Sequence, residues 1–126
     1  MAVRTSVQKV RLLGEPRDVM VARTFLRRAL KERHLDDHGD DAELVLSELV
    51  TRSIVNGRGP VDVVITIDGD AVHLQVSDQD PTFPVVTQAD ESWREDRAVS
   101  IIDALAEWSV EQSGMGKTVT ARVPLH

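Results

Sequence analysis

The sequence predicts an α+β two-layer sandwich, in which about three helices cover one face of a mixed, mostly antiparallel sheet. Three observations predict it: two consecutive amphipathic helical segments, two alternating segments joined by Gly69-Asp70, and a last helical segment followed by two further alternating segments. The order strand, helix, helix, strand, strand, helix, strand, strand places the helices on one side of a single sheet. A chain of 126 residues is of single-domain size, so we expect one domain over residues 1–126.

The first strand and the first helix are expected within residues 2–35. Apolar and polar residues alternate over residues 2–13, which predicts a strand that ends before Gly14. A helix opens at Glu15-Pro16, because proline and acidic residues suit a first turn whose N–H groups have no helical partner. Its apolar residues keep helical spacing to about Leu35, so this face packs inward.

A second helix is predicted from about Asp40 to Asn56, with aspartates available as its N-cap. Its apolar residues occupy two faces, so we expect the core to cover one face and a less regular segment to cover the other. Glycines and a proline at residues 57–60 end the helix. The alternating segments Val61–Asp68 and Ala71–Asp78 then form a β-hairpin.

The third part of the chain begins with a long connection. Residues 79–97 hold two prolines and many charges without periodicity, and a connection of this length indicates a lid or a binding role. A short helix is expected over Ala98–Ala106. Two last strands are expected over about Glu107–Gln112 and Lys117–Val123.

Composition narrows the classes of function. Hydrophobic residues make up 41% and charged residues 29%, the balance of a folded globular protein. The absence of cysteine excludes disulfides, thiolate metal sites and cysteine nucleophiles. No segment approaches the ~18 apolar residues of a membrane helix, and the N-terminus has no signal-peptide pattern. We therefore expect a cytoplasmic protein that makes no membrane contact.

The net charge of −6 is unevenly distributed. Residues 1–33 carry nine Lys or Arg against three Asp or Glu, which gives them +6 and leaves −12 for the remainder. The basic residues sit on the first helix with little aromatic company, and the acidic remainder offers no footprint for a phosphate backbone. We expect no direct nucleic-acid binding and interpret this helix as a solvated or partner-facing surface.

Two common sites can be set aside. Gly116-Lys117-Thr118 is similar to the end of a phosphate-binding loop, but Glu111 stands where that motif needs glycine and a strand follows instead of a helix. The histidines do not have the spacing of a metal-ligand set, so we expect no metal site; they are His34, His38, His73 and His126.

Four segments carry motifs in register with the predicted elements. They are Glu48-Leu49-Val50-Thr51-Arg52-Ser53, Asp78-Gln79-Asp80-Pro81, Arg97-Ala98 with the apolar helix behind it, and Gly116-Lys117-Thr118-Val119. Together they resemble the GHKL ATPase superfamily, and more closely its anti-sigma-factor serine kinase branch. The resemblance covers about residues 15–124 and implies the histidine kinase-like ATPase fold of the Bergerat type.

The resemblance implies roles for three residues of the nucleotide site. Glu48 matches the general base of the motif E-L-V-T-N-A, which makes it the candidate catalytic residue. Arg52 stands where the family has a magnesium-binding asparagine, so it would contact a phosphate directly. Asp78 matches the aspartate that accepts a hydrogen bond from the adenine amino group.

The resemblance adds four further candidate nucleotide contacts. Asp80 lies in the same D-x-G-P motif as the adenine-binding aspartate. Arg97 and Ala98 match the phosphate-loop motif, in which this chain keeps the arginine and none of the glycines. Thr118 matches the threonine that sits beside the adenine-binding aspartate.

Two departures from the family pattern should weaken the binding of ATP and of Mg²⁺. An arginine has only donors and stays protonated, so Arg52 cannot bind Mg²⁺. Glu95 and Asp96 put carboxylates where the phosphate loop would be neutral, and like charges at 4 Å repel by roughly 1 kcal/mol in water and about 4 at an effective dielectric of 20. We expect ATP binding to be weak or lost and no Mg²⁺ to be held.

Each motif also has a structural interpretation. Glu48 and Arg52 are spaced as an i,i+4 ion pair worth ~0.3–0.5 kcal/mol. Asp78 could start a turn with Asp80-Pro81. The helix after Ala98 could be a core element, and the segment around Thr118 could be the exit of a hairpin.

Three hypotheses for function remain open. The first is a regulatory protein resembling an anti-sigma factor, which binds a sigma factor or an anti-anti-sigma partner and has weak or lost ATP binding. The second is an active ATP-dependent serine/threonine protein kinase acting on an anti-sigma-factor antagonist, and the third is a nucleotide sensor without catalysis. No phospho-acceptor helix precedes the domain, which disfavours a histidine kinase. The resemblance also implies a homodimer.

Overall fold

The computed structural model describes residues 6–56, 59–79, 97–114 and 116–125. Five strands form one sheet in the order β1-β2-β3-β5-β4, and every pairing of neighbouring strands is antiparallel. Their bounds are β1 (Ser6–Leu12), β2 (Val61–Asp68), β3 (Ala71–Asp78), β4 (Glu107–Ser113) and β5 (Gly116–Pro124).

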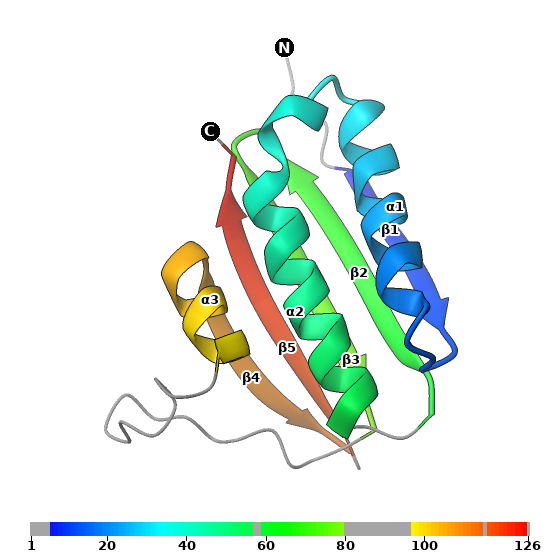
Figure 1. Cartoon of the computed structure of the whole chain (residues 1–126). Coiled ribbons are helices and arrows are strands. Elements are labelled where there is room, and N and C mark those ends of the chain that lie inside the picture. Colours follow the sequence, from blue (N-terminus) through cyan, green and yellow to red (C-terminus); the bar gives the residue numbers. More distant parts are fainter. Residues whose placement is uncertain (1–5, 57–58, 80–96, 115, 126) are drawn as a thin grey trace.

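Three α-helices lie on one face of this sheet (Figure 1), and the other face carries no helix in the described part of the chain. The helices are α1 (Asp18–Lys31), α2 (Asp40–Asn56) and α3 (Arg97–Leu105), with a short 3-10 helix η1 (Asp36–His38) between the first two. α2 lies between α1 and α3 and packs on both. The predicted fold class is confirmed, with antiparallel pairing throughout the described strands.

The core lies between the sheet and the helices. Side chains alternate along the three central strands β2, β3 and β5, so one set faces the helices and is fully buried. The largest buried side chains come from both layers and include Leu26, Leu30, Leu46, Leu49, Ile65, Ile67 and Leu74. The second apolar face of α2 is partly open, since Leu44 is 43% and Val55 73% exposed. Val45 of this face is fully buried, and the expectation that a less regular segment covers the face stays a prediction, because residues 80–96 lie outside the described residues.

The first helix is shorter at both ends than its apolar pattern predicts. At its start the Asp18 carboxylate is buried and accepts hydrogen bonds from the backbone N–H groups of Gly14 and Glu15, at 2.8 and 2.9 Å. At its end His34 has a φ of 58°, and the Leu35 N–H donates to the Leu30 carbonyl at 2.9 Å. A left-handed residue with this return hydrogen bond ends a helix although the apolar spacing continues.

The turn after β1 contacts the connection before β2. Gly14 has a φ of +94°, and a Cβ at this position would lie 2.4 Å from the carbonyl oxygen of Gly59. Only glycine fits such an approach of two backbones.

No helix in the described residues is long and apolar enough to cross a membrane.

Candidate nucleotide site

α2 carries two of the candidate residues, Glu48 and Arg52, and both are half-buried. Glu48 lines a hollow of about 440 Å³ between α1 and α2. The other residues of this hollow are Arg23, Arg27, Asp40, Glu43, Leu44 and Ser47. No ion pair joins Glu48 to Arg52 within the described ranges, so the i,i+4 pair expected from their spacing is not formed.

Asp78 is the last residue of β3 and lies opposite Lys117, the second residue of β5. The Lys117 Nζ donates hydrogen bonds to both carboxylate oxygens of Asp78, at 2.8 Å to Oδ1 and 2.9 Å to Oδ2. The two side chains are only 1% and 3% exposed. Each charge would be costly to bury alone, so the two are stable there as a pair. The candidate adenine-binding carboxylate therefore already accepts hydrogen bonds from the chain itself.

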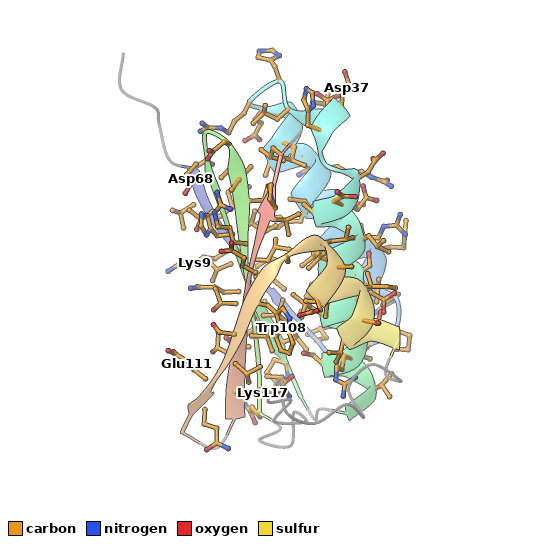
Figure 2. The ribbon with its side chains drawn as sticks, turned by 90° about the vertical axis from the view of Figure 1, so that its left-hand side faces the viewer. Lys9, Asp37, Asp68, Trp108, Glu111 and Lys117 are labelled. Atoms are coloured by element: carbon orange, nitrogen blue, oxygen red, sulfur yellow. The ribbon has the colours of Figure 1, made fainter. Side chains whose placement is uncertain are left out.

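Lys117 is the buried charged residue at this site that motif matching did not single out. The inward positions of β5 alternate, and Lys117 shares them with Val119, Ala121 and Val123. A lysine in an otherwise apolar inward series needs a buried anion, and Asp78 ends the neighbouring strand on the same side. The alternation of β5 was the signal that could have found this pair. Figure 2 shows Lys117 at the end of the sheet where β5 begins.

Thr118 lies on the opposite face of the sheet from Asp78. It is in register with Ser77, and the two hydroxyl groups are 2.8 Å apart in a hydrogen bond. Side chains of successive residues in a strand point to opposite faces, so Lys117 and not Thr118 contacts the carboxylate. The structure thus does not bring Thr118 beside Asp78, where the resemblance implied that it would be.

Gly116 holds the start of β5 close to the end of β3. A Cβ at this position would lie 2.0 Å from the Asp78 carbonyl oxygen and 2.8 Å from the Gln79 Cα. Both contacts are with backbone, which cannot move aside as a flexible side chain can. The glycine is therefore a condition for the approach of the two strands that carry the buried pair.

The phosphate-loop candidates are only partly described. Arg97 and Ala98 are the first two residues of α3, one residue earlier than the predicted helix start, and their side-chain positions are not described. Asp80, with Glu95 and Asp96, lies outside the described residues. The predictions for these residues therefore stay predictions.

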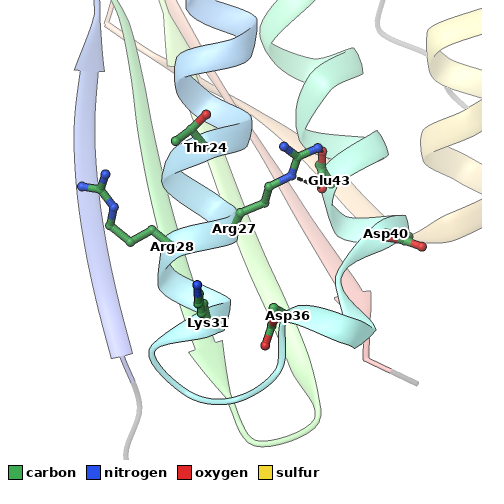
Figure 3. Close-up of a pocket in the computed structure, with 7 residues that line it drawn as sticks. All are labelled: Thr24, Arg27, Arg28, Lys31, Asp36, Asp40 and Glu43. Carbon is green, nitrogen blue, oxygen red and sulfur yellow. Dashed lines mark hydrogen bonds and ion pairs between the residues drawn. The ribbon is translucent and has the colours of Figure 1, made fainter.

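A second cluster of charges lies in the groove between α1 and α2 (Figure 3). Glu43 accepts hydrogen bonds from Arg23 Nε at 2.8 Å and from Arg27 Nε at 3.0 Å. Burial alone would raise the pKa of Glu43, but the hydrogen bonds from Arg27 and Arg23, together with their charges, hold the pKa below its usual range. This carboxylate ties the two helices together in its ionised form.

The comparisons with known proteins identify the family. The family model of the histidine kinase-like ATPase domain matches residues 12–123, which covers all but the ends of the chain. The chain therefore belongs to the histidine kinase-like ATPase family. A comparison with curated proteins found no match.

The family implies a nucleotide, so the residues can be tested for their fit to magnesium ATP. Lys117 already donates to both oxygens of Asp78, so an adenine amino group would have to share the carboxylate with a buried ammonium, and Arg52 offers no oxygen where the family has its magnesium ligand. Within the described ranges no group of three or more histidine, aspartate or glutamate residues could hold a metal ion. The described part of the site does not fit magnesium ATP in the way that the family motif implies.

Proposed function

We propose that this chain is a regulatory, protein-binding member of its family of the anti-sigma-factor type, with weak or lost ATP binding. Its proposed partner is a sigma factor or an anti-anti-sigma factor, and these partner classes come from the resemblance of the motifs. The observation that carries the proposal is the buried ion pair between Asp78 and Lys117.

The energies of the two competing arrangements support this proposal. Moving Lys117 aside to make room for adenine beside Asp78 would break a buried ion pair, and leaving one buried charge without its partner costs about 3–5 kcal/mol. A hydrogen bond from a neutral amino group would return only about 0.5–1.5 kcal/mol. Displacing Lys117 is therefore unfavourable, and an adenine amino group could use only the lone pairs of the carboxylate that Lys117 leaves open.

The kinase alternative is less well supported by the same residues. A kinase of this type needs the nucleotide and Mg²⁺ to be held next to the general base. Glu48 is present and half-buried, but Arg52 cannot serve as a metal ligand. Without a metal ligand beside the general base, phosphoryl transfer from magnesium ATP lacks a group that it needs.

Calorimetry with ATP, in the presence and absence of Mg²⁺, tests the proposal. We expect no measurable heat of binding from the unmodified chain under either condition. Magnesium-dependent ATP binding with ordinary affinity, while the Asp78 pair is intact, would contradict the proposal and support the kinase.

Adenosine and inosine test the role of Lys117 without the phosphates. Lys117→Met keeps the volume and removes the ammonium, so we expect this variant to gain adenosine binding and to discriminate against inosine, which lacks the amino group. The control Asp78→Asn/Lys117→Met has lost the carboxylate and should bind neither nucleoside. Equal binding of the two nucleosides by Lys117→Met would show that Lys117 does not stand in for the adenine amino group.

A further inference from the structure

The exposed charges of α1 are all positive. Its only acidic residue is Asp18, which is 5% exposed and turned toward the backbone N–H groups of Gly14 and Glu15. The remaining charged residues lie along the helix and are Arg23, Arg27, Arg28 and Lys31. A basic helix face on a chain with a net charge of −6 is a local feature that the average composition does not explain.

Apolar side chains are exposed on the same helix. Met20 is 53% and Val21 46% exposed, and together with Phe25 they line a hollow of about 360 Å³. Thr24 and Arg28 complete this hollow. The residue spacing of i, i+4 and i+8 from Met20 through Thr24 to Arg28 places them in one stripe along α1.

A second hollow continues this stripe toward the end of the helix (Figure 3). It has a volume of about 490 Å³ and shares Thr24 and Arg28 with the first hollow. Its other residues are Arg27, Lys31, Asp36, Asp40 and Glu43. The two hollows therefore adjoin at Thr24 and Arg28, and together they are called the trough along α1, which is apolar around Met20 and Val21 and basic around Arg28 and Lys31.

Only some of the cations in this trough are available to a partner. Arg23 and Arg27 are held by Glu43. Arg28 and Lys31 make no ion pair with any residue in the described part of the chain, and Figure 3 shows Arg28 pointing away from α2. These two cations lie three residues apart on the exposed side of the helix.

The charge pattern selects among possible anionic occupants. Asp36 and Asp40 lie on the wall facing Lys31, so a continuous polyanion such as a nucleic-acid backbone or an anionic membrane would meet repulsion there. A peptide can place carboxylates against α1 alone and apolar side chains against Met20 and Val21. An apolar anchor next to complementary charge is how amphipathic helices are recognised in grooves.

We propose that the trough along α1 is a docking surface for an acidic amphipathic helix of a protein partner. This inference rests on the proposed function, because it assumes that the chain acts by binding another protein. It adds the chemistry of the bound segment: leucine-like side chains enter the Met20 end, and glutamate or aspartate side chains pair with Arg28 and Lys31.

Two labelled synthetic peptides test the proposal by fluorescence anisotropy. One is an amphipathic helix of leucine, alanine and glutamate, and the other has lysine in place of every glutamate. We expect the acidic peptide to bind and the basic peptide to bind at least about tenfold more weakly. In NMR titrations the shifted amides should lie in α1. Equal binding of both peptides, or shifts confined to the open face of the sheet, would overturn the proposal.

Charge reversal provides matched variants. Lys31→Glu removes a trough cation, and Lys9→Glu makes the same change on the helix-free face of the sheet (Figure 2). We expect the double variant Arg28→Glu/Lys31→Glu to lose about tenfold in affinity for the acidic peptide, because exposed pairs contribute modestly and reversal turns two attractions into repulsions. Lys9→Glu should leave the affinity unchanged. An equal loss in Lys9→Glu and Lys31→Glu would mean that only net charge matters and would refute the docking surface.

Two further probes decide whether the surface is for protein. Vesicles containing phosphatidylglycerol, and a short DNA duplex, should compete weakly or not at all with the acidic peptide. Strong binding of either probe that is lost in Arg28→Glu/Lys31→Glu would overturn the proposal in favour of phosphate recognition. A chain that binds neither ATP nor the acidic peptide would refute this inference and leave the proposed function standing, whereas magnesium-dependent ATP binding of ordinary affinity would refute the proposed function.

Discussion

Two carboxylates at opposite ends of the sandwich are each held by cations, but in different surroundings. Glu43 lies near the start of α2, in a groove where Arg23 is 36% and Arg27 54% exposed. Asp78 lies where β5 begins, and its partner Lys117 is 3% exposed. The Glu43 carboxylate is itself 12% exposed, but its two arginines reach solvent, so this exposed cluster can exchange its cations with water or with another protein at small cost, while the buried pair cannot separate without leaving a charge in the core.

This difference bears on the proposed loss of ATP binding and on the proposed docking surface. The buried pair is specified by two residues in register on neighbouring strands, so we propose that the single residue Lys117 disfavours adenine at this carboxylate. The proposed docking surface is spread over a face of α1, away from Lys117. The two clusters should therefore respond differently to substitution, with a larger loss of stability at the buried pair than at the exposed cluster.

The largest effect is expected from breaking the buried pair. Lys117→Met leaves the Asp78 carboxylate buried without its cation, so the free energy of unfolding should fall by about 3–5 kcal/mol, measured by urea denaturation. Asp78→Asn/Lys117→Met removes both charges and should be more stable than the single variant. If the free energy of unfolding of Lys117→Met falls by less than about 1 kcal/mol, the buried pair stabilises the fold no more than an exposed pair does. The proposed difference between the two clusters would then be wrong.

A smaller effect is expected at the glycine beside the buried pair. Gly116→Ala forces a Cβ to within 2.0 Å of the Asp78 carbonyl oxygen, so we expect a loss of about 2–3 kcal/mol from overpacking against backbone. Gly114→Ala is the matched control in the same hairpin. It has no atom within 4 Å of its added Cβ, and only its φ of +59° opposes the change, at a cost of about 1 kcal/mol. Equal losses in thermal or urea unfolding would show that β3 moves freely away from β5.

The order of helices and strands could be predicted from the sequence. The side-chain contacts of the candidate site could be predicted only in part. Helical and alternating spacing predicted the sandwich, and four motifs predicted which elements would carry the site. The motifs could not say which strand face a residue takes, which is why Thr118 was assigned to the site and Lys117 was not. The sheet face on which a side chain lies depends on the strand register. In β5 a shift of one position decides whether Lys117 or Thr118 lies on the same face as Asp78.

The ends of elements were also set by features that spacing does not contain. The apolar pattern of the first helix runs to Leu35, but the positive φ of His34 ends α1 at Lys31 with a return hydrogen bond. Likewise Glu48 and Arg52 have the spacing of an ion pair, and the described residues show no ion pair between them. Sequence spacing gives neighbours on an ideal helix, and tertiary packing then chooses which of them interact.

The smallest effect is expected at the exposed cluster, and pH gives it a signature. Glu43→Gln removes the charge that holds Arg23 and Arg27, which should cost about 1 kcal/mol near neutral pH. Because the folded-state pKa of Glu43 is lowered, the stabilisation is complete above the ordinary value of 4.5 and is lost as pH falls through the lower folded-state value. The gap in unfolding free energy between wild type and Glu43→Gln should therefore close below about pH 4.5.

The control for that measurement is Asp62→Asn, which removes a pair with Arg11 whose side chains are 47% and 67% exposed. Its effect should be smaller than that of Glu43→Gln, because solvent screens the pair. Glu43→Gln also releases two arginines into the trough along α1, so its affinity for the acidic peptide should rise while its stability falls. A variant that loses stability and affinity together would show that Glu43 shapes the trough instead of competing for its cations, and the exposed cluster would then be as fixed as the buried one.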